Sequence, residues 1–138
     1  MAGTFALRVV SPEGNVLKDD VEFMVLPSEA GELGILPNHA PLIAGLNVGV
    51  MRYTKDGSTQ RLAISGGFVE VADNQVTVLA ETAEPGEMID LERALAAKER
   101  AEKRLSMRTG EIDVRRAELA LRKALARINA AEDGAKHH

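Results

Sequence analysis

Four cations in the second half of the chain could form one basic cluster. Arg100, Lys123 and Arg127 have no carboxylate three or four positions away, which is the spacing at which side chains meet on a helix. Arg93 lies seven positions before Arg100 and so shares its helix face. If two helices fold back on each other here, Arg93 and Arg100 face Lys123 and Arg127. Such a cluster suits phosphate, so the spacing predicts a pocket for a phosphate-bearing ligand. Four separately solvated cations are an open alternative.

Motifs for catalysis are absent. The sequence has no GxxxxGK[ST], HExxH or GxSxG. His39 follows Pro37 and Asn38, a setting typical of a loop or contact histidine. The chain has no cysteine, which excludes disulfides and thiolate metal sites. We therefore expect a non-enzymatic chain with no metal site and no catalytic cofactor.

The elements that would position these groups fall into two halves. Residues 4–11, 21–26, 48–53, 60–65, 68–71 and 75–80 are rich in strand formers with turn residues between them. Asp56-Gly57 and Asp73-Asn74 are typical of tight hairpin turns. Short strands at this spacing predict a β-sandwich or barrel.

The second half changes to a helical period. Asp90 can cap a helix that runs from about residue 90 to 107, with Leu91, Ala94, Leu95, Ala101 and Leu105 on one face. Gly110 breaks the pattern, and a second helix follows over residues 111–131, with a stripe at Ala117, Leu121, Ala124, Leu125 and Ile128. We therefore expect an α+β chain: a β domain over residues 1–86 and an antiparallel helical hairpin over 87–135, with 136–138 as a possible tag remnant.

The contact between the two predicted helices is largely alanine. Alanine offers little apolar surface to bury, whereas the intrinsic helix propensity of this segment is high. We therefore interpret the hairpin as an arm whose helices persist while its packing is easily undone, with a stable hairpin as the equal alternative.

Charge and hydropathy limit the possible partners. The net charge is −4, divided into −7 for residues 1–88 and +3 for residues 89–138. The acidic balance and the absence of interleaved aromatic residues argue against nucleic acid. No apolar stretch approaches the ~20 residues of a membrane span, and no signal peptide is visible, so we expect no direct membrane insertion.

Three motifs resemble a known family. The segments GELGILPNHAPL (residues 31–42), SGGFVEV (65–71) and RAELAL (116–121) are similar to the epsilon subunit of bacterial F-type ATP synthases, in the same order along the chain. The resemblance implies a ten-stranded β-sandwich followed by the helical hairpin. It implies a non-catalytic subunit of the central rotor stalk, at the cytoplasmic face of the bacterial membrane within the F1 sector. The partners that it implies are the gamma subunit and the c-subunit ring, with Glu32 and His39 at that contact.

The resemblance also implies a mobile arm that responds to ATP. Residues 89–94, IDLERA, match the I/L-D-x-x-R-A motif with which some family members bind ATP in the folded state. ATP is then a regulatory ligand, and the sequence does not decide whether Mg²⁺ accompanies it. Lys123 departs from the family, whose best-known ATP binder has Arg there. The implied ATP-binding residues are Glu84, Ile89, Asp90, Arg93, Ala94, Arg100, Lys123 and Arg127.

An extended arm would contact other subunits. The resemblance implies that the extended arm reaches the catalytic alpha and beta subunits and inhibits ATP hydrolysis. The basic residues of the second helix that we expect at this contact are Arg115, Arg116 and Arg122. An alternative function is a free-standing ATP-sensing binding module outside any large complex.

Overall fold

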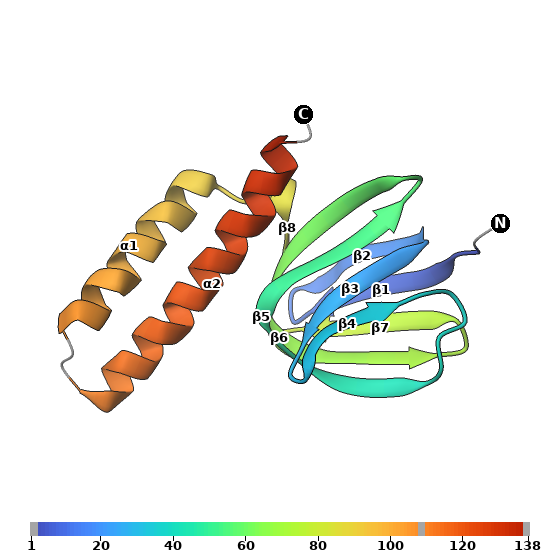
Figure 1. The fold of residues 1–138 in the computed structure, drawn as a ribbon, viewed down its shortest axis with the longest axis horizontal. Coiled ribbons are helices and arrows are strands. Elements are labelled where there is room, and N and C mark those ends of the chain that lie inside the picture. The colour runs from blue at the N-terminus through green and yellow to red at the C-terminus, as the bar shows by residue number, and fades with distance from the viewer. Residues whose placement is uncertain (1–2, 108–109, 137–138) are drawn as a thin grey trace.

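A computed structural model describes residues 3–107 and 110–136, apart from the side chains of residues 111, 112 and 132–136. The chain is α+β, with a β-sandwich followed by a helical hairpin, as the sequence predicted (Figure 1). The elements are β1 Phe5–Ser11, β2 Gly14–Val21, β3 Phe23–Ser28, β4 Gly31–Ile35, β5 Leu42–Lys55, β6 Ser58–Ala72, β7 Gln75–Ala80, β8 Ala83–Pro85, the 3-10 helix η1 Gly86–Met88, α1 Leu91–Met107 and α2 Glu111–Lys136.

The expected count of ten strands is wrong, because the residues that the structure describes form eight. They are hydrogen-bonded in the order β2-β1-β7-β6-β5-β3-β4, with β8 also on β6. The long strands β5 and β6 pair on both sides of a break at Asn47 and Gly66. The first half of β6 also pairs with β8 and the second half with β7. Each of these two strands therefore continues from one layer of the sandwich into the other. Counting the two halves of β5 and of β6 as separate strands would give ten.

The two predicted hairpin turns are confirmed. Asp56 and Gly57 connect β5 to β6 with φ of 50° and 75°, and Asp73 and Asn74 connect β6 to β7 with φ of 51° and 59°. Positive φ at both central residues is the type I′ geometry, which matches the twist of the flanking strands.

Three strands were missed by the sequence analysis, namely β2, β4 and β8. The predicted strand at residues 21–26 spans a boundary, because Val21 ends β2 and β3 begins at Phe23. Strand β2 lies at the edge of the sheet and is mostly polar, as edge strands often are. Its Asp19 pairs with Lys55 Nζ at 2.6 Å, and this hydrogen bond lowers the pKa of the Asp19 carboxyl and raises that of Lys55.

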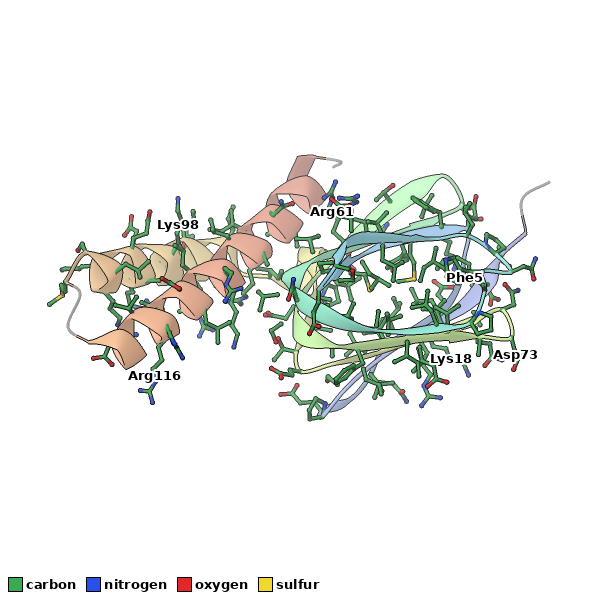
Figure 2. All side chains as sticks on the ribbon, turned by 60° about the horizontal axis from the view of Figure 1, so that its bottom comes forward. Phe5, Lys18, Arg61, Asp73, Lys98 and Arg116 are labelled. Carbon is green, nitrogen blue, oxygen red and sulfur yellow. The ribbon has the colours of Figure 1, made fainter. Side chains whose placement is uncertain are left out.

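The sandwich encloses the main hydrophobic core. Alternate side chains of β1, β3, β6 and β7 point inward, and Phe5 lies inside the sandwich in Figure 2. The fully buried members include Leu7, Met24, Leu26 and Val69. This period-2 burial is what the strand pattern predicted.

The helical hairpin docks on the sandwich through α2. Helix α2 lies between α1 and the sandwich and contacts β5, β6 and η1 (Figure 1). A second, smaller core forms there from Ala63, Ile89, Ala94, Ala126, Ala130 and Ala131. The predicted stripes are therefore only partly right, because Leu95 and Leu125 are 42% and 45% exposed while alanines make the contact.

The predicted helix cap is confirmed. The Arg93 backbone N–H donates to Asp90 Oδ1 at 3.1 Å, which satisfies one of the free donors at the start of α1. Helix α2 extends to Lys136, five residues beyond the predicted end. Of the suspected tag remnant, His137 and His138 lie outside the described residues.

Candidate functional site

A pocket lies where the arm meets the sandwich. Its volume is about 330 Å³. Strand β6 and the β7–β8 segment form one wall, and α1 and α2 form the other. The residues that line it are Ala63, Ile64, Ser65, Thr82, Glu84, Ala97, Ala120, Lys123, Ala124, Ala126 and Arg127. The apolar wall and the charged rim suit a ligand with a flat apolar part and an anionic part.

One ion pair crosses the pocket from the sandwich to the arm. Arg127 Nη2 donates to Glu84 Oε2 at 3.2 Å, and Arg127 Nε lies 2.9 Å from Glu84 Oε1. Both contacts are short, so the Arg127 guanidinium is held against the Glu84 carboxylate at the boundary between α2 and the sandwich.

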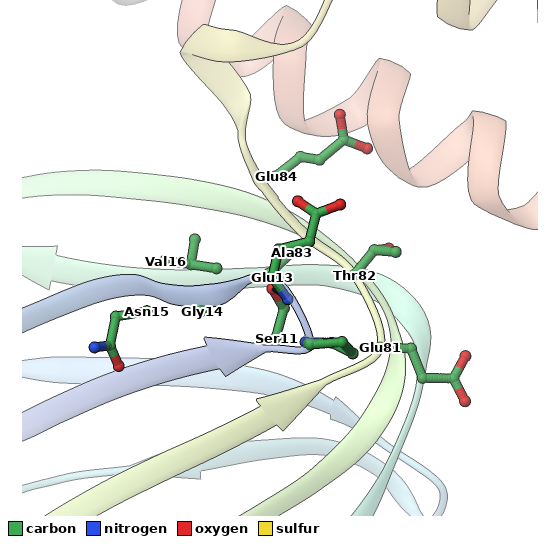
Figure 3. Close-up of a pocket in the computed structure, with 10 residues that line it drawn as sticks. Ser11, Glu13, Gly14, Asn15, Val16, Glu81, Thr82, Ala83 and Glu84 are labelled. Carbon is green, nitrogen blue, oxygen red and sulfur yellow. Dashed lines mark hydrogen bonds between the residues drawn. The ribbon is translucent and has the colours of Figure 1, made fainter.

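Three of the predicted ATP-binding residues line this pocket. They are Glu84, Lys123 and Arg127. Their elements explain this, because β8 carries Glu84 to the face of α2 and Lys123 and Arg127 lie one helical turn apart. Figure 3 shows the Glu84 side chain extending toward the helices.

The other predicted ATP-binding residues have different surroundings. Ile89 and Ala94 are buried in the smaller core, and Asp90 caps α1. Arg93 and Arg100 are exposed on α1 and do not line the pocket. Their approach to a ligand stays a prediction.

The sequence analysis missed the neutral residues of the pocket. The hydroxyls of Ser65 and Thr82 hydrogen-bond to each other at its sandwich wall, and Ala97 and Ala120 line its helical wall. Small and hydroxyl residues carry no ligand signal in a sequence, so only their placement reveals them.

A second hollow of about 520 Å³ lies beside the β1–β2 turn (Figure 3). Glu13, Glu81 and Glu84 contribute carboxylates to its lining, and the Glu13 backbone N–H donates to Ser11 Oγ at 3.3 Å. In the described part of the chain, no three His, Asp or Glu side chains are grouped so as to hold a metal ion. Glu84 lines both hollows, so the carboxylate is shared between them.

Large apolar side chains are exposed on the outer face of β5, β6 and β7. Phe68 and Leu79 are direct cross-strand partners that are 60% and 52% exposed, and Ile43 is 74% exposed. Residues 68–69 and 78–79 are apolar on both faces of their strands, a pattern typical of strands covered on both sides. That pattern could have revealed this surface from the sequence, and an exposed apolar cluster indicates a docking surface.

The predicted contact residues Glu32 and His39 lie on different elements. Glu32 is in β4 and pairs with Arg52 Nη2 at 3.0 Å. His39 lies in the loop after β4, where its Nδ1 is 2.8 Å from the Ala40 carbonyl oxygen. The loop is held by Asn74 Oδ1, which accepts from the Asn38 backbone N–H at 2.8 Å.

The three predicted inhibitory residues lie on α2. Arg115 and Arg116 are exposed, and Arg116 points away from the sandwich in Figure 2. Arg122 instead lines a groove of about 350 Å³ between α2 and the sandwich, together with Glu32 and Arg52. Whether these arginines touch another subunit stays a prediction.

Comparison with known proteins accounts for both halves of the chain. The description "ATP synthase, Delta/Epsilon chain, beta-sandwich domain" matches residues 4–86, and "ATP synthase, Delta/Epsilon chain, long alpha-helix domain" matches residues 87–132. The chain belongs to the ATP synthase delta/epsilon family. It is 71% identical to the ATP synthase epsilon chain of Desulfitobacterium hafniense (strain DSM 10664 / DCB-2) over 133 residues, which are 96% of this chain and 100% of that one.

More distant relatives carry the same description or belong to the same kind of complex. The ATP synthase epsilon chain of Bacillus velezensis (strain DSM 23117 / BGSC 10A6 / LMG 26770 / FZB42) is 51% identical over 93% of this chain and 97% of its own. A chain in the structure of the Euglena gracilis mitochondrial ATP synthase (OSCP/F1/c-ring) is 26% identical, with a TM-score of 0.78, and the match covers 99% of this chain and 84% of that one.

Membership of the family defines the broad role of this chain. It is an epsilon subunit of the ATP synthase complex, of the bacterial F-type, and is non-catalytic. Among the described residues, no helix is long and apolar enough to cross a membrane.

Proposed function

We propose that this epsilon subunit acts as a ligand-sensitive switch in the rotor stalk, with the helical arm as its moving part. The docked arm is stabilised by ATP bound in the 330 Å³ pocket, and the extended arm inhibits ATP hydrolysis. The observation that carries the proposal is the pocket itself. It is lined by Glu84 of the sandwich and by Lys123 and Arg127 of α2, so it exists only while α2 lies on the sandwich.

The docked arm offers a suitable place for a nucleotide. Lys123 and Arg127 supply two cations at the rim of an otherwise alanine-rich pocket. Arg93 and Arg100 would complete the phosphate contacts by side-chain movement, since both are exposed on the neighbouring helix. Glu84 is suited to an amino group of the base, because a carboxylate repels phosphate.

Docking energetics support a switch. The contact between the arm and the sandwich is made largely by alanines, which bury little apolar surface each. A ligand that binds only the docked state stabilises it by RT ln(1 + [L]/Kd), or about 1.4 kcal/mol at ten times Kd. A term of that size can decide a balance between weakly docked and undocked arms.

The sandwich supplies the docking surface for the rotor. The exposed cluster of Ile43, Phe68 and Leu79 suits an apolar surface of the gamma subunit, and Glu32 and His39 lie in segments that would face the c ring. In the extended state, Arg115, Arg116 and Arg122 would meet acidic groups of the alpha and beta subunits. These contacts would hold the protein at the cytoplasmic face of the bacterial membrane.

Calorimetric titration with ATP tests the pocket. We expect heat of binding for the wild type and a loss of at least tenfold in affinity for Arg127→Ala, because charge-assisted contacts contribute ~1.5–3 kcal/mol each. Lys103→Ala is the control, since Lys103 is an exposed cation of α1 away from the pocket lining. Equal heats for the wild type, Arg127→Ala and Arg93→Ala would contradict the proposed site.

Assays of the assembled complex test the switch. Millimolar ATP should relieve inhibition of hydrolysis in the wild type, and neutralising Arg115, Arg116 and Arg122 together should weaken inhibition without loss of assembly. Full inhibition in that triple variant would show that these side chains do not hold the extended arm.

A further inference from the structure

Gly86 lies where the backbone of the arm passes very close to the chain that leaves the sandwich. It begins η1, directly after β8, and it is buried. A methyl group built on its Cα would lie 2.4 Å from the Ala130 carbonyl oxygen of α2 and 3.3 Å from the Arg61 carbonyl oxygen of β6. Both neighbours are backbone atoms, which cannot rotate away as the end of a side chain can.

Glycine is required at position 86 because there is no room for a Cβ atom, and not because of its backbone angles. The positive-φ glycines of the described chain do not include Gly86, so an L-residue could adopt its backbone angles. The obstacle is the backbone of α2, which passes over the Gly86 Cα with no room for a carbon atom between them.

The surroundings make α2 the element that must give way. The Arg61 carbonyl belongs to β6, which pairs with β5 and β8 on its two sides. Near Gly86, helix α2 is held by Ala130 and Ala131, with Ala63 and Ala126 in the same core. Moving α2 away exposes only these small side chains, whereas distorting the sheet would disturb the larger core of the sandwich, so moving α2 costs less free energy.

We infer that Gly86 is the docking contact that sets the balance between the docked and undocked arm, and that any side chain at this position acts as a wedge. The inference rests on the proposed function, from which it takes the movement of the arm. It adds where the docked state is controlled: at η1, the short segment between β8 and α1, by direct backbone-to-backbone contact and outside the ATP pocket. Gly86 does not line that pocket.

A distance measurement on the full chain tests the wedge. Because the chain has no cysteine, spin labels on Thr59→Cys and Glu118→Cys report one distance between the sandwich and α2, and both positions are exposed. Gly86→Ala should lower the ratio of docked to undocked arms by about tenfold or more, because overpacked contacts are strongly disfavoured. Millimolar ATP should restore part of the docked population by mass action.

Gly34→Ala is the matched control. A methyl group at Gly34 would meet only the Phe23 ring, at 3.6 Å, an ordinary contact distance, so its docked ratio should equal that of the wild type. Ala130→Leu adds bulk to the same contact from the helix side, where Ala130 is 0% exposed, and should undock the arm as Gly86→Ala does.

Amide hydrogen exchange separates undocking from unfolding. Protection of β1 and β7 should remain at the wild-type level in Gly86→Ala. A wild-type docked ratio in Gly86→Ala, or equal loss of protection in the sandwich and the arm, would overturn the inference. If the wild-type arm docks but its docked ratio does not respond to ATP, the proposed function is contradicted instead. The docked ratios of Gly86→Ala and Gly34→Ala would still show whether the Gly86 contact controls docking.

Discussion

The Glu84–Arg127 ion pair should contribute to arm docking and to little else. Glu84 belongs to β8 and Arg127 to α2, 43 residues apart in the chain, and the pair bridges the two domains at 2.9 and 3.2 Å. Neither helix nor sheet depends on it internally. Glu84→Gln and Arg127→Met keep most of the shape of each side chain while removing the charge, so they isolate the electrostatic part of docking.

The expected coupling free energy is about 1 kcal/mol. Unit charges at about 4 Å in an effective dielectric of 20 attract by about 4 kcal/mol, but desolvation and lost side-chain freedom offset most of that. Fully exposed pairs retain ~0.2–1 kcal/mol. The Arg127 and Glu84 side chains are 29% and 39% exposed, which places this pair at the upper end of that range, or about a fivefold change in the docked ratio.

A double-mutant cycle measures this coupling. The labelled pair Thr59→Cys and Glu118→Cys reports the docked ratio in the parent, both single variants and the double variant. The coupling should shrink in 1 M salt, where the Debye length is about 3 Å. The same cycle on Lys98 and Glu102, which both lie on α1, should give no coupling in docking. Additive effects of Glu84→Gln and Arg127→Met, within about 0.3 kcal/mol, would refute the reasoning.

Three further predictions concern the apolar surface, the edge strand and the cap. Phe68→Ser should weaken assembly with the rotor by tenfold or more in a pull-down titration. The melting temperature of the isolated chain should stay near that of the wild type, because Phe68 is 60% exposed. Unchanged assembly would exclude this surface as the docking site. The hydrogen bond from Lys55 lowers the pKa of the Asp19 carboxyl below its ordinary 3.8, so the pair stabilises the fold fully above that pH and loses its effect as the pH falls through the folded pKa. Asp19→Asn should therefore flatten the acid end of the stability–pH curve, and a curve of unchanged slope would contradict the pair. Asp90→Ala should destabilise α1 by ~1 kcal/mol through loss of the cap, seen as faster amide exchange in its first turn and unchanged exchange in β1.

Local features of this protein could be predicted from its sequence because short-range chemistry determines them. Positive φ suits Asn, Asp and Gly, so Asp56-Gly57 and Asp73-Asn74 marked both tight turns. The Asp90 cap followed from the need of free N–H groups at a helix start. The family motifs then identified the chain type, which the matches over residues 4–86 and 87–132 confirm.

Errors in the prediction arose where distant segments compete for the same face. The polar strand β2 gave no hydrophobic signal, because an edge strand can be solvated. The exposure of Leu125 could not be predicted from periodicity, since two faces of α2 are covered, one by α1 and one by the sandwich. Alanines fill those contacts because the backbones lie close together.

The sequence by itself determined the two halves, the turns, the cap and the basic residues of the arm, because each depends on neighbours within a few positions. Only the tertiary structure decided which cations meet a partner. It brought Glu84 to Arg127 across the domain boundary and left Arg93 and Arg100 exposed. It also placed the Gly86 Cα beneath the Ala130 carbonyl, a contact without side-chain chemistry that depends wholly on how closely two backbones pack.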